Sequence, residues 1–511
     1  MTTDYLNQDW DAVIIGTGMG GGTIGRVLAT GGWRVLFIEK GPSGHRSERQ
    51  ALHSHVFTPD ARALRGFWPT PLRAKIDNRE SEFFAPIGAG VGGSSAFYAA
   101  TLERPERHDM DDHPHAEWPI SFDTMQPWYD EAEKMFHVCG APDPLSAEPM
   151  PELLPPPALD PSDDALMGEM RAIGLHPYRL HSAIRYVENC HDCLGSKCPK
   201  PCKMDGRSAG VEPALATGNA FVLDDAEVVD LKRDGRTITE ITLCRSGVEY
   251  RLSPKRVILA GGALGSAHIL LKSDIANSSG LVGRNLMFHL NEMFALWPKK
   301  KVLGDATSKA ISLRDLYHQD ATRFGTVQSM GIGAGYGEIL HYLRLMLTRS
   351  ALSRVPLIMD LARIPAAVAV KMLGSAKVLV GLLEDYGYPE NRVIFDPARP
   401  EQLSIEYVLA PELKARRRAF RKAIRRAFRG HRKMFLSMQP ELNFGHPCGT
   451  LRFGTEAETS VLDPNCKAHD HDNLWVVDSS FMPTSFGVNP SLTIAANAIR
   501  VGHHLLKEAR S

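Results

Sequence analysis

The sequence predicts an α/β fold built from two closely joined domains. Its 511 residues exceed what one hydrophobic core usually contains, and the hydrophobic content of 43% is sufficient to bury two cores. Two segments far apart in the chain, residues 11–21 and 256–262, each have the pattern of a buried strand that enters a glycine turn ahead of a helix. Repeated strand–turn–helix units indicate a parallel sheet, here assembled from separated parts of the chain.

The first of these units has the residues of a dinucleotide site. A β-branched apolar run, residues 11–15, leads directly into a glycine-rich turn. In such a turn Gly16 permits the sharp bend, Gly18 lets the backbone approach a pyrophosphate, and Gly21 lets helix and strand pack closely. The N-terminus of the following helix supplies amide donors and a positive partial charge.

The next elements complete this pattern. Residues 23–30 carry apolar side chains at helical spacing, and a second apolar strand, residues 35–38, ends at Glu39. An acid about twenty residues after the glycines, at the tip of the second strand, is placed to accept hydrogen bonds from a ribose diol. The sequence therefore predicts a dinucleotide site of the Rossmann type. A glycine turn without a ligand would leave Glu39 unexplained.

Composition and charge argue against several classes of protein. Lys plus Arg equals Asp plus Glu, at 59 each, so no global field recruits nucleic acid. No signal-peptide pattern precedes the first strand, which favours a cytoplasmic location; export bound to a partner that carries a signal is the alternative. The hydrophobic segment 355–383 is interrupted by charges, which predicts two amphipathic helices. No transmembrane segment is expected, and peripheral contact with a membrane stays open.

Two polar residues stand out near the other end of the chain. His446 opens the segment His-Pro-Cys-Gly-Thr, and Asn489 directly precedes Pro490. An isolated histidine is usually a satisfied core residue, as His289 is expected to be, and an asparagine before proline usually lies in a turn. The other interpretation is that both residues complete a site whose nucleotide is held by the N-terminal turn.

Taken in order, the motifs of the chain resemble those of the glucose-methanol-choline (GMC) family of flavin oxidoreductases. The resemblance spans almost the whole chain and rests on the glycine turn with Glu39, residues 88–95, 258–266 and 282–286, and the segments of His446 and Asn489. It implies an FAD-binding Rossmann-like domain of the GMC and glutathione-reductase type, together with a discontinuous α+β substrate domain. The implied FAD-binding domain comprises residues 1–110, 203–290 and 440–511, and the substrate-binding domain comprises residues 111–202 and 291–439.

The resemblance also implies which residues hold an FAD in an extended form. Gly16, Gly18, Gly21 and Glu39 would bind the adenosine and pyrophosphate, Gly92 and Ser95 would lie near the flavin, and further contacts would come from Val228 at the adenine, Asp478 at the ribityl-pyrophosphate region, and Pro490. Many members place an Asn, or a His that bonds covalently to the flavin, just after the glycine-serine turn. This chain has Ala96-Phe97-Tyr98 there, so the FAD is predicted to be non-covalent.

By the same resemblance His446 would be the base and Asn489 its partner, and the chemistry requires such a pair. Oxidation of a CH–OH group removes the hydroxyl proton and sends a hydride to flavin N5, so a histidine near the operating pH has to meet the hydroxyl. Asn489 can donate a hydrogen bond to the alkoxide that develops. The predicted function is FAD-dependent oxidation of an alcohol, such as a sugar, a glycoside or another polyol, to a carbonyl.

Other functions fit the same motifs. One is a GMC-type oxidase that acts on an aromatic or sterol alcohol and uses O2. Another is a non-redox lyase that contains FAD, and a third is a noncatalytic subunit. A dehydrogenase is favoured over an oxidase because of the cysteines described next.

Four of the eight cysteines form a cluster, Cys190-x2-Cys193-x4-Cys198-x3-Cys202. Close thiolate spacing in a chain without a signal sequence favours a metal over disulfides. The last three cysteines resemble the cluster-binding segment of the catalytic subunits of bacterial FAD-dependent sugar dehydrogenases, which belong to the same family. This resemblance implies a [3Fe–4S] or other iron–sulfur cluster that passes electrons outward. A zinc site with four thiolates and a pair of disulfides are the alternatives.

The segment 414–433 contains eleven Lys or Arg residues and no acid, with apolar residues at helical spacing. It predicts a basic amphipathic helix. A solvated helix packed by its apolar stripe is the simpler interpretation. The alternative is a docking face for an acidic electron-acceptor protein or small subunit, or for an anionic membrane.

Overall fold

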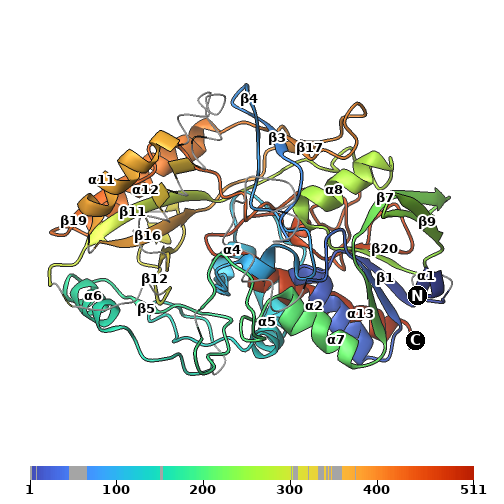
Figure 1. The fold of residues 1–511 in the computed structure, drawn as a ribbon, viewed down its shortest axis with the longest axis horizontal. Coiled ribbons are helices and arrows are strands. Elements are labelled where there is room, and N and C mark those ends of the chain that lie inside the picture. Colours follow the sequence, from blue (N-terminus) through green and yellow to red (C-terminus); the bar gives the residue numbers. More distant parts are fainter. Residues whose placement is uncertain are drawn as a thin grey trace.

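The structure is a computed structural model, and the residues that it describes are 3–6, 8–44, 62, 66–149, 153–190, 192–300, 302, 309–319, 322–331, 339–340, 343–344, 347, 360–374 and 376–510. Figure 1 shows two regions of the molecule. A parallel sheet with its helices lies at the right, together with both chain ends, and an antiparallel sheet lies at the left.

A five-stranded sheet in the order β20-β10-β1-β2-β6 forms the centre of the first region, and every neighbouring pair in it is parallel. Its strands are β1 (Ala12–Ile15), β2 (Val35–Ile38), β6 (Ala220–Leu223), β10 (Val257–Leu259) and β20 (Leu474–Val476). All residues of β1, β2, β10 and β20 are buried, as expected for parallel strands covered by helices. The predicted parallel sheet of separated segments is confirmed.

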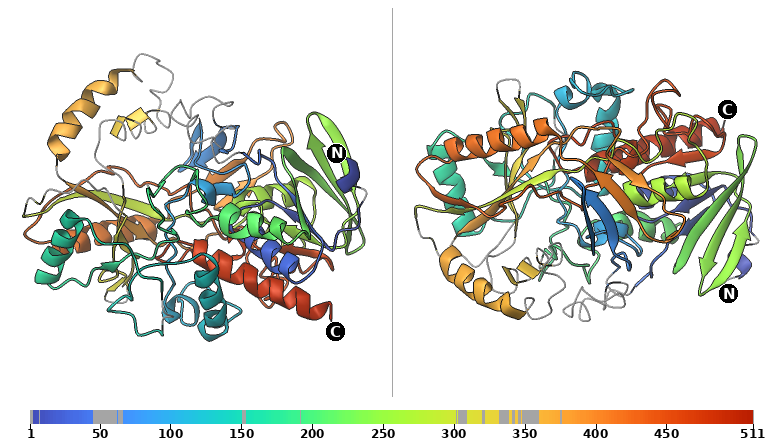
Figure 2. Two further views of the ribbon diagram at one scale, coloured as in Figure 1. Left: turned by 60° about the horizontal axis from the view of Figure 1, so that its bottom comes forward. Right: turned by 90° about the horizontal axis from the view of Figure 1, so that it is seen from above.

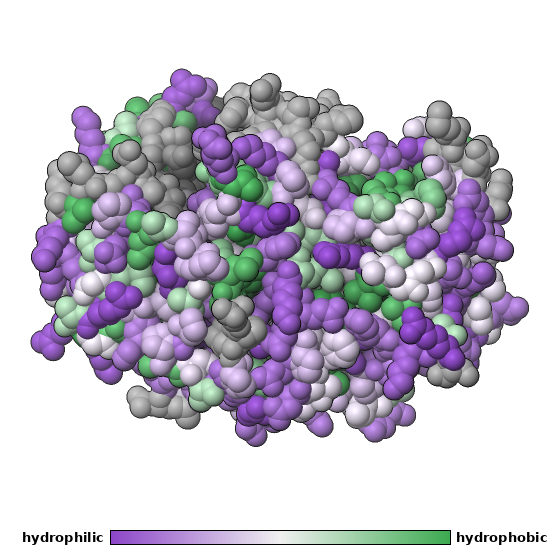
Figure 3. Space-filling model, turned by 90° about the horizontal axis from the view of Figure 1, so that it is seen from below, coloured by the Kyte–Doolittle hydropathy of each residue, from purple (hydrophilic) through white to green (hydrophobic). Residues whose placement is uncertain are grey.

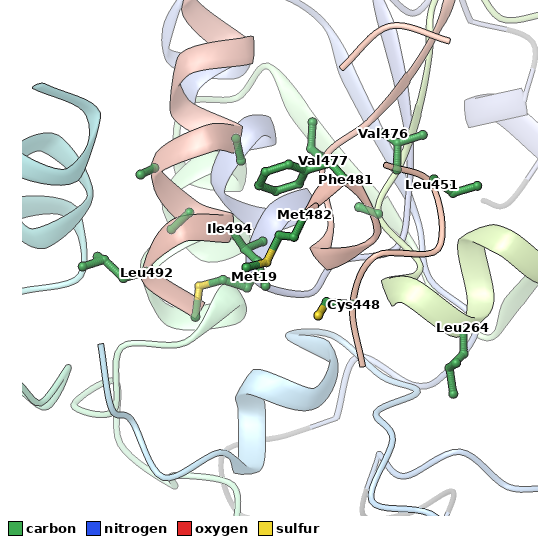
Figure 4. Packing of buried hydrophobic residues seen from close by; sticks show 14 of the residues in the cluster. Met19, Leu264, Cys448, Leu451, Val476, Val477, Phe481, Met482, Leu492 and Ile494 are labelled. Atoms are coloured by element: carbon green, nitrogen blue, oxygen red, sulfur yellow. The ribbon is translucent and has the colours of Figure 1, made fainter. Parts of the chain in front are cut away.

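Three helices pack side by side in this region, α2 (Met19–Thr30), α13 (Ser491–Glu508) and α5 (Phe122–Met135). A Cβ on Gly502 would lie 2.8 Å from a side-chain carbon of Val27, so a larger residue would push α13 away from α2. Figure 4 shows that the side chains of Met19, Met482 and Ile494 meet where α13 begins. The start of α13 is therefore anchored in the core.

Two smaller sheets adjoin this region. One is antiparallel and consists of β7 (Ala226–Asp234), β8 (Thr237–Arg245) and β9 (Val248–Leu252). The other is mixed and consists of β17 (Arg392–Ile394), β18 (Ser404–Tyr407), β3 (Leu72–Ile76) and β4 (Arg79–Phe83). In the mixed sheet β3 pairs with β18 in parallel, so an early and a late segment share hydrogen bonds. The predicted domain boundaries stay a prediction.

The second region is built on a six-stranded sheet in the order β19-β11-β16-β15-β12-β5. Its pairs are all antiparallel, and its strands are β5 (Tyr178–Arg179), β11 (Leu290–Trp297), β12 (Ile311–Leu313), β15 (Val327–Ser329), β16 (Lys377–Leu383) and β19 (Arg432–Phe435). Most of the basic segment lies in α12 (Pro411–Ala427), which packs on this sheet through Phe420, Ile424 and Phe428, but its last two residues, Arg432 and Lys433, begin strand β19 and are not helical as predicted. In both views of Figure 2, α11 (Arg363–Leu373) lies on the opposite side of the strands from α12.

The hydrophobic segment 355–383 differs from its prediction as two helices. Residues 363–373 form α11, but residues 377–383 form strand β16 between β11 and β15. A Cβ on Gly381 would lie 2.5 Å from the ring of Phe420, so this strand approaches α12 closely. An apolar run of this length has no decisive periodicity, and pairing with two neighbouring strands determines its structure. Residues 355–359 lie outside the described part of the chain.

The remaining elements connect these sheets and helices. They are α1 (Thr3–Leu6), the 3₁₀-helix η2 (Gly93–Phe97), α4 (Arg107–Met110), α6 (Pro161–Ala172), the π-helix η3 (Gly206–Val211), α7 (Glu212–Ala216), α8 (Gly262–Lys272), β13 (His318–Gln319), β14 (Thr322–Arg323) and the 3₁₀-helix η5 (Ser479–Phe481).

Exposed apolar side chains on the described surface are concentrated on α11. Ile364, Val368 and Met372 are 65%, 53% and 52% exposed. No described helix combines the length and apolar character that crossing a membrane requires. On the face shown in Figure 3, hydrophilic residues cover most of the described surface and hydrophobic ones form small separate areas.

Candidate active site

The loop after β1 is shaped to receive an anionic group. Gly16 has a φ of +101°, and a Cβ there would lie 2.4 Å from the carbonyl oxygen of Ala260. A Cβ on Gly21 would lie 2.1 Å from the carbonyl oxygen of Gly16. Helix α2 begins directly after Gly18, with no side-chain cap and no acid in its first turn. Its first amide groups are therefore left as donors at the positive end of the helix.

A second glycine turn lies against the first. A Cβ on Gly93 would lie 2.9 Å from Cα of Gly18, and Gly92 has a φ of +99°. Ser95 donates a hydrogen bond to the carbonyl oxygen of Gly92 at 2.6 Å and accepts one from the N–H of Gly206 at 2.9 Å. Three backbone segments thus meet around Gly18 with no side chain between them. Such a cradle fits a pyrophosphate.

Glu39 lies at the end of β2 and is buried. Its carboxylate accepts hydrogen bonds from the N–H of Thr17 and the N–H of Gly41, both at 3.1 Å, and from the Thr17 hydroxyl at 2.5 Å. Burial raises the pKa of Glu39. These donors fix the orientation of the carboxylate at the edge of the cradle. The acid and the cradle together fit a dinucleotide.

Asp478 lies beside the first turn of α2. A Cβ on Gly20 would lie 2.0 Å from the carbonyl oxygen of Val477, the residue before Asp478. The buried Asp478 carboxylate accepts hydrogen bonds from the N–H of Gly262 at 3.0 Å and from the hydroxyl of Ser266 at 2.5 Å. Burial raises its pKa. Asp478 therefore joins the turn that follows β10 to the turn that follows β20.

The two other predicted cofactor residues lie on neighbouring elements. Val228 is buried in β7, and the N–H of Ala226 in that strand donates to the carbonyl oxygen of Glu39 at 2.9 Å. Pro490 is the N-cap residue of α13 and is buried. Val228 is thus adjacent to the Glu39 end of the cradle, and Pro490 follows Asn489.

His446 is half-buried and meets a second histidine. Its Nδ1 lies 3.1 Å from Nδ1 of His289, and Nε2 of His289 lies 3.0 Å from the carbonyl oxygen of Phe486. A carbonyl only accepts, so Nε2 of His289 carries the proton. Burial lowers the pKa of His289 to about 4, which keeps the ring neutral and its Nδ1 an acceptor. The donor between the rings is then Nδ1–H of His446, and Nε2 of His446 is left unprotonated.

The Asn443 amide competes with this arrangement. Its Nδ2 lies 3.1 Å from Nδ1 of His446, a contact that favours the opposite tautomer. Asn443 is half-buried, and its Oδ1 accepts a hydrogen bond from the N–H of Gly445 at 3.0 Å, whereas His289 is fully buried and fixed by Phe486. The more rigid of the two partners, His289, favours the tautomer of His446 with a free Nε2.

The pKa of His446 is held well below its ordinary value of 6.5. Burial is the main cause, and the nearby His289 and Lys309 add to it. The ring is consequently neutral at physiological pH. A neutral imidazole with a free Nε2 is the form that a general base requires.

Asn489 is oriented by Gln328 of β15. Nε2 of Gln328 donates to Oδ1 of Asn489 at 2.7 Å and also to the Thr326 hydroxyl at 3.1 Å. Because Oδ1 of Asn489 is occupied, its Nδ2 is the group available to donate to a substrate oxygen. Phe486, which His289 contacts, lies three residues before Asn489. His446 is therefore linked through His289 to the loop that carries Asn489.

The four clustered cysteines pack against one another. The Cys193, Cys198 and Cys202 side chains are buried, Cys190 is half-buried, and the Sγ atoms of Cys198 and Cys202 are 3.1 Å apart. Hydrogen bonds from the Cys193 and Cys202 thiols lower the pKa of Cys198. Within the described residues, however, no group of three or more His, Cys, Asp and Glu side chains is arranged to hold a metal ion. The structure thus gives the predicted iron–sulfur cluster no support.

A buried lysine links the cysteine loop to the glycine turn. Nζ of Lys203 donates to the carbonyl oxygens of Cys193 at 2.9 Å and Ser196 at 2.5 Å, and to that of Tyr98 at 3.3 Å. Burial lowers the pKa of Lys203 to about 8. The Tyr98 hydroxyl donates to the carbonyl oxygen of Met204 at 2.5 Å. The cysteine loop therefore lies against the segment predicted to be near the flavin.

Two family models match this chain. Both are described as GMC oxidoreductase, and they match residues 11–291 and 396–498. The chain belongs to the GMC oxidoreductase family. The resemblance on which the sequence prediction rests is confirmed.

Relatives in this family cover nearly the whole GMC chain. The 6'''-hydroxyparomomycin C oxidase of Streptomyces lividus is 24% identical over 96% of the chain and 90% of its own length. The fructose dehydrogenase large subunit of Gluconobacter japonicus is 23% identical over 100% of each chain. The formate oxidase of Aspergillus oryzae, whose solved structure concerns FAD modification, aligns with a TM-score of 0.69 at 16% identity over 99% of each chain. This likeness confirms the predicted fold class.

Proposed function

We propose that this GMC oxidoreductase binds FAD and oxidises an alcohol to a carbonyl, with His446 as the base and Asn489 as its partner. The observation that carries the proposal is the contact between His289 and His446, which leaves Nε2 of a neutral histidine free. Asn489 supports it, because Gln328 leaves the donor end of the Asn489 amide available.

The FAD would be held by the residues of the cradle. Its pyrophosphate would lie at the start of α2, at Gly16, Gly18 and Gly21, and its ribose at Glu39. When bound, FAD supplies a hydride acceptor at flavin N5. Ala96-Phe97-Tyr98 contains no histidine, which supports non-covalent binding.

The residues of the chain supply the proton transfer and the charge stabilisation. Nε2 of His446 takes the proton of the substrate hydroxyl, and the histidine becomes an imidazolium. Nδ2 of Asn489 donates a hydrogen bond to the oxygen as negative charge develops on it. General-base catalysis of this kind contributes about 10²- to 10⁴-fold to a rate.

The substrate would be a sugar, a glycoside or another polyol. The names of two relatives support this, since one is a hydroxyparomomycin oxidase and the other a fructose dehydrogenase. One is an oxidase and the other a dehydrogenase, so the relatives do not favour either reaction. We propose a dehydrogenase, because the spacing of Cys193, Cys198 and Cys202 resembles the cluster-binding segment of FAD-dependent sugar dehydrogenases.

We also propose partners for the exposed surfaces and a cytoplasmic location, with export on a signal-bearing partner as the alternative. An acidic electron-acceptor protein or small subunit would dock on the exposed cations of α12, which are Arg418, Lys422, Arg425 and Arg426, and on Arg429 just after the helix. Peripheral contact with a membrane would use the apolar stripe of α11.

The test is anaerobic addition of candidate alcohols to the purified flavoprotein, followed by its visible spectrum. The proposal predicts that the oxidised flavin bands bleach with a sugar or polyol. A lyase would convert its substrate while the flavin stays yellow, and a noncatalytic subunit would leave both unchanged.

A further inference from the structure

One face of the six-stranded sheet is turned toward the candidate active site. Gln328 on this sheet contacts Asn489. The antiparallel register places Gln328 beside Val380, and Val380 beside Met293. Residues paired across antiparallel strands carry their side chains on the same face. We call this face, with Gln328, Val380 and Met293, the site face.

Asn291 belongs to the site face as well. It lies two residues before Met293 on β11 and is paired with Leu382, which lies two residues after Val380 on β16. His289, which orients His446, precedes Asn291 by two residues. The site face therefore carries one amide close to the partner of His446 and another that contacts Asn489.

Both amides have an oxygen without a partner. Oε1 of Gln328 and Oδ1 of Asn291 are removed from water and accept no hydrogen bond from any described residue. Gln328 is fully buried, with an exposed fraction of 0%. Buried polar atoms almost always have a hydrogen-bond partner, and an orphaned one destabilises the fold. Two such oxygens on one face beside the site indicate a ligand that brings hydrogen-bond donors.

Around the two amides the site face is largely apolar, and the register also places Ser312 beside Gln328. Met293, Val380 and Leu382 form a cluster separate from the main core, and the partly buried Met330 and Leu436 pack against it. Amide oxygens on an apolar wall accept hydrogen bonds and offer no positive charge. They suit a ligand that has hydroxyl groups on a C–H framework.

We propose that Asn291 and Gln328 form a subsite that accepts hydrogen bonds from a second hydroxyl of a polyhydroxylated substrate, while His446 acts on the first. The inference rests on the proposed function and names its substrate class. The C–H framework of such a substrate would pack against Met293, Val380 and Leu382.

The experiment compares glycerol with propanol as substrates of the FAD-loaded protein. We expect the wild type to favour glycerol in kcat/KM by about 10- to 100-fold, because propanol leaves the amide oxygens unpaired. Asn291→Leu and Gln328→Leu should each lower this ratio by about tenfold. Gln328→Leu also releases Asn489, but that loss affects both substrates and cancels in the ratio. Met330→Leu, on the same face, keeps both amides and should leave the ratio unchanged.

Binding to the oxidised protein provides a second measurement that needs no turnover. Titration calorimetry should show tighter binding of glycerol than of propanol, and both leucine variants should lose the difference. If both variants are active and keep the wild-type ratio of kcat/KM for glycerol and propanol, and the same difference in binding, the subsite is refuted. The proposed function would stay intact. Protein that binds glycerol through these amides but bleaches with no alcohol would refute the proposed function alone. If both leucine variants lose as much affinity for ethanolamine as for ethylene glycol, the subsite accepts hydrogen bonds from any donor, which would contradict our assignment of a hydroxyl.

Discussion

Replacing His289 with leucine tests the most specific feature of the site. The leucine removes the Nδ1 acceptor that lies 3.1 Å from His446 and the Nε2 donor that lies 3.0 Å from the Phe486 carbonyl. His446 would then respond to Asn443, whose Nδ2 lies 3.1 Å from the same Nδ1 and favours the tautomer that protonates Nε2. We expect the free Nε2 to be lost in most molecules.

The magnitude follows from the hydrogen bonds involved. Losing the bond to His289 removes about 1 to 1.5 kcal/mol of preference for the tautomer with a free Nε2, and the bond from Asn443 is present in both proteins, so it cancels in the comparison. This change corresponds to a decrease of about 5- to 13-fold in the rate constant of flavin reduction. The Phe486 carbonyl, left without its donor, would cost a further 1 to 3 kcal/mol, roughly, in the free energy of unfolding.

The assay is anaerobic stopped-flow reduction of the flavin by a polyol, measured against pH. His289→Asn places an amide oxygen near the former Nδ1, so it should restore much of the rate, whereas His289→Gln retains only the donor to Phe486. The acid limb of the rate profile should also move to higher pH in His289→Leu, because His289 helps to lower the pKa of His446. A leucine variant that binds FAD normally and is reduced at the wild-type rate would refute this role.

Three further predictions concern pH and metal content. The wild-type reduction rate should stay constant as the pH falls past 6.5, and should decrease only at the lowered pKa of His446, because the neutral ring is the base; an acid limb at or above pH 6.5 would contradict this. Burial raises the pKa of Asp385 from 3.8 to about 7, so the folded state keeps a proton that the unfolded state loses. The free energy of unfolding should then fall by up to about 4 kcal/mol as the pH rises from about 4 to 7, and Asp385→Asn should flatten this dependence in denaturant titrations. The cysteine spacing predicts iron and acid-labile sulfide in anaerobically purified protein. Zinc alone, or no metal, would contradict the prediction of an iron–sulfur cluster.

The local parts of the fold could be predicted from the sequence. The glycine-rich turn around Gly16 is encoded within a few tens of residues, and the predicted strands and helix are present. Residues 377–383 were not recognised as a strand, because an apolar run of this length fits a helix or a strand until its neighbours are known.

The residues that orient the site could not be predicted. His289 is 157 residues from His446, and Gln328 is 161 residues from Asn489. Neither has a sequence motif that marks its role, because the role arises only when the sheet and the loop before α13 come together. The unpartnered oxygen of Gln328 could not be predicted either, because it depends on which residues surround Gln328 in the folded protein.

The most direct test of the central claim is anaerobic reduction of the flavin in His446→Ala. The account predicts that the variant binds FAD and its substrate but is reduced about 10²- to 10⁴-fold more slowly than the wild type. Reduction of the variant at the wild-type rate, with the same substrate and the same flavin content, would show that His446 is not the base.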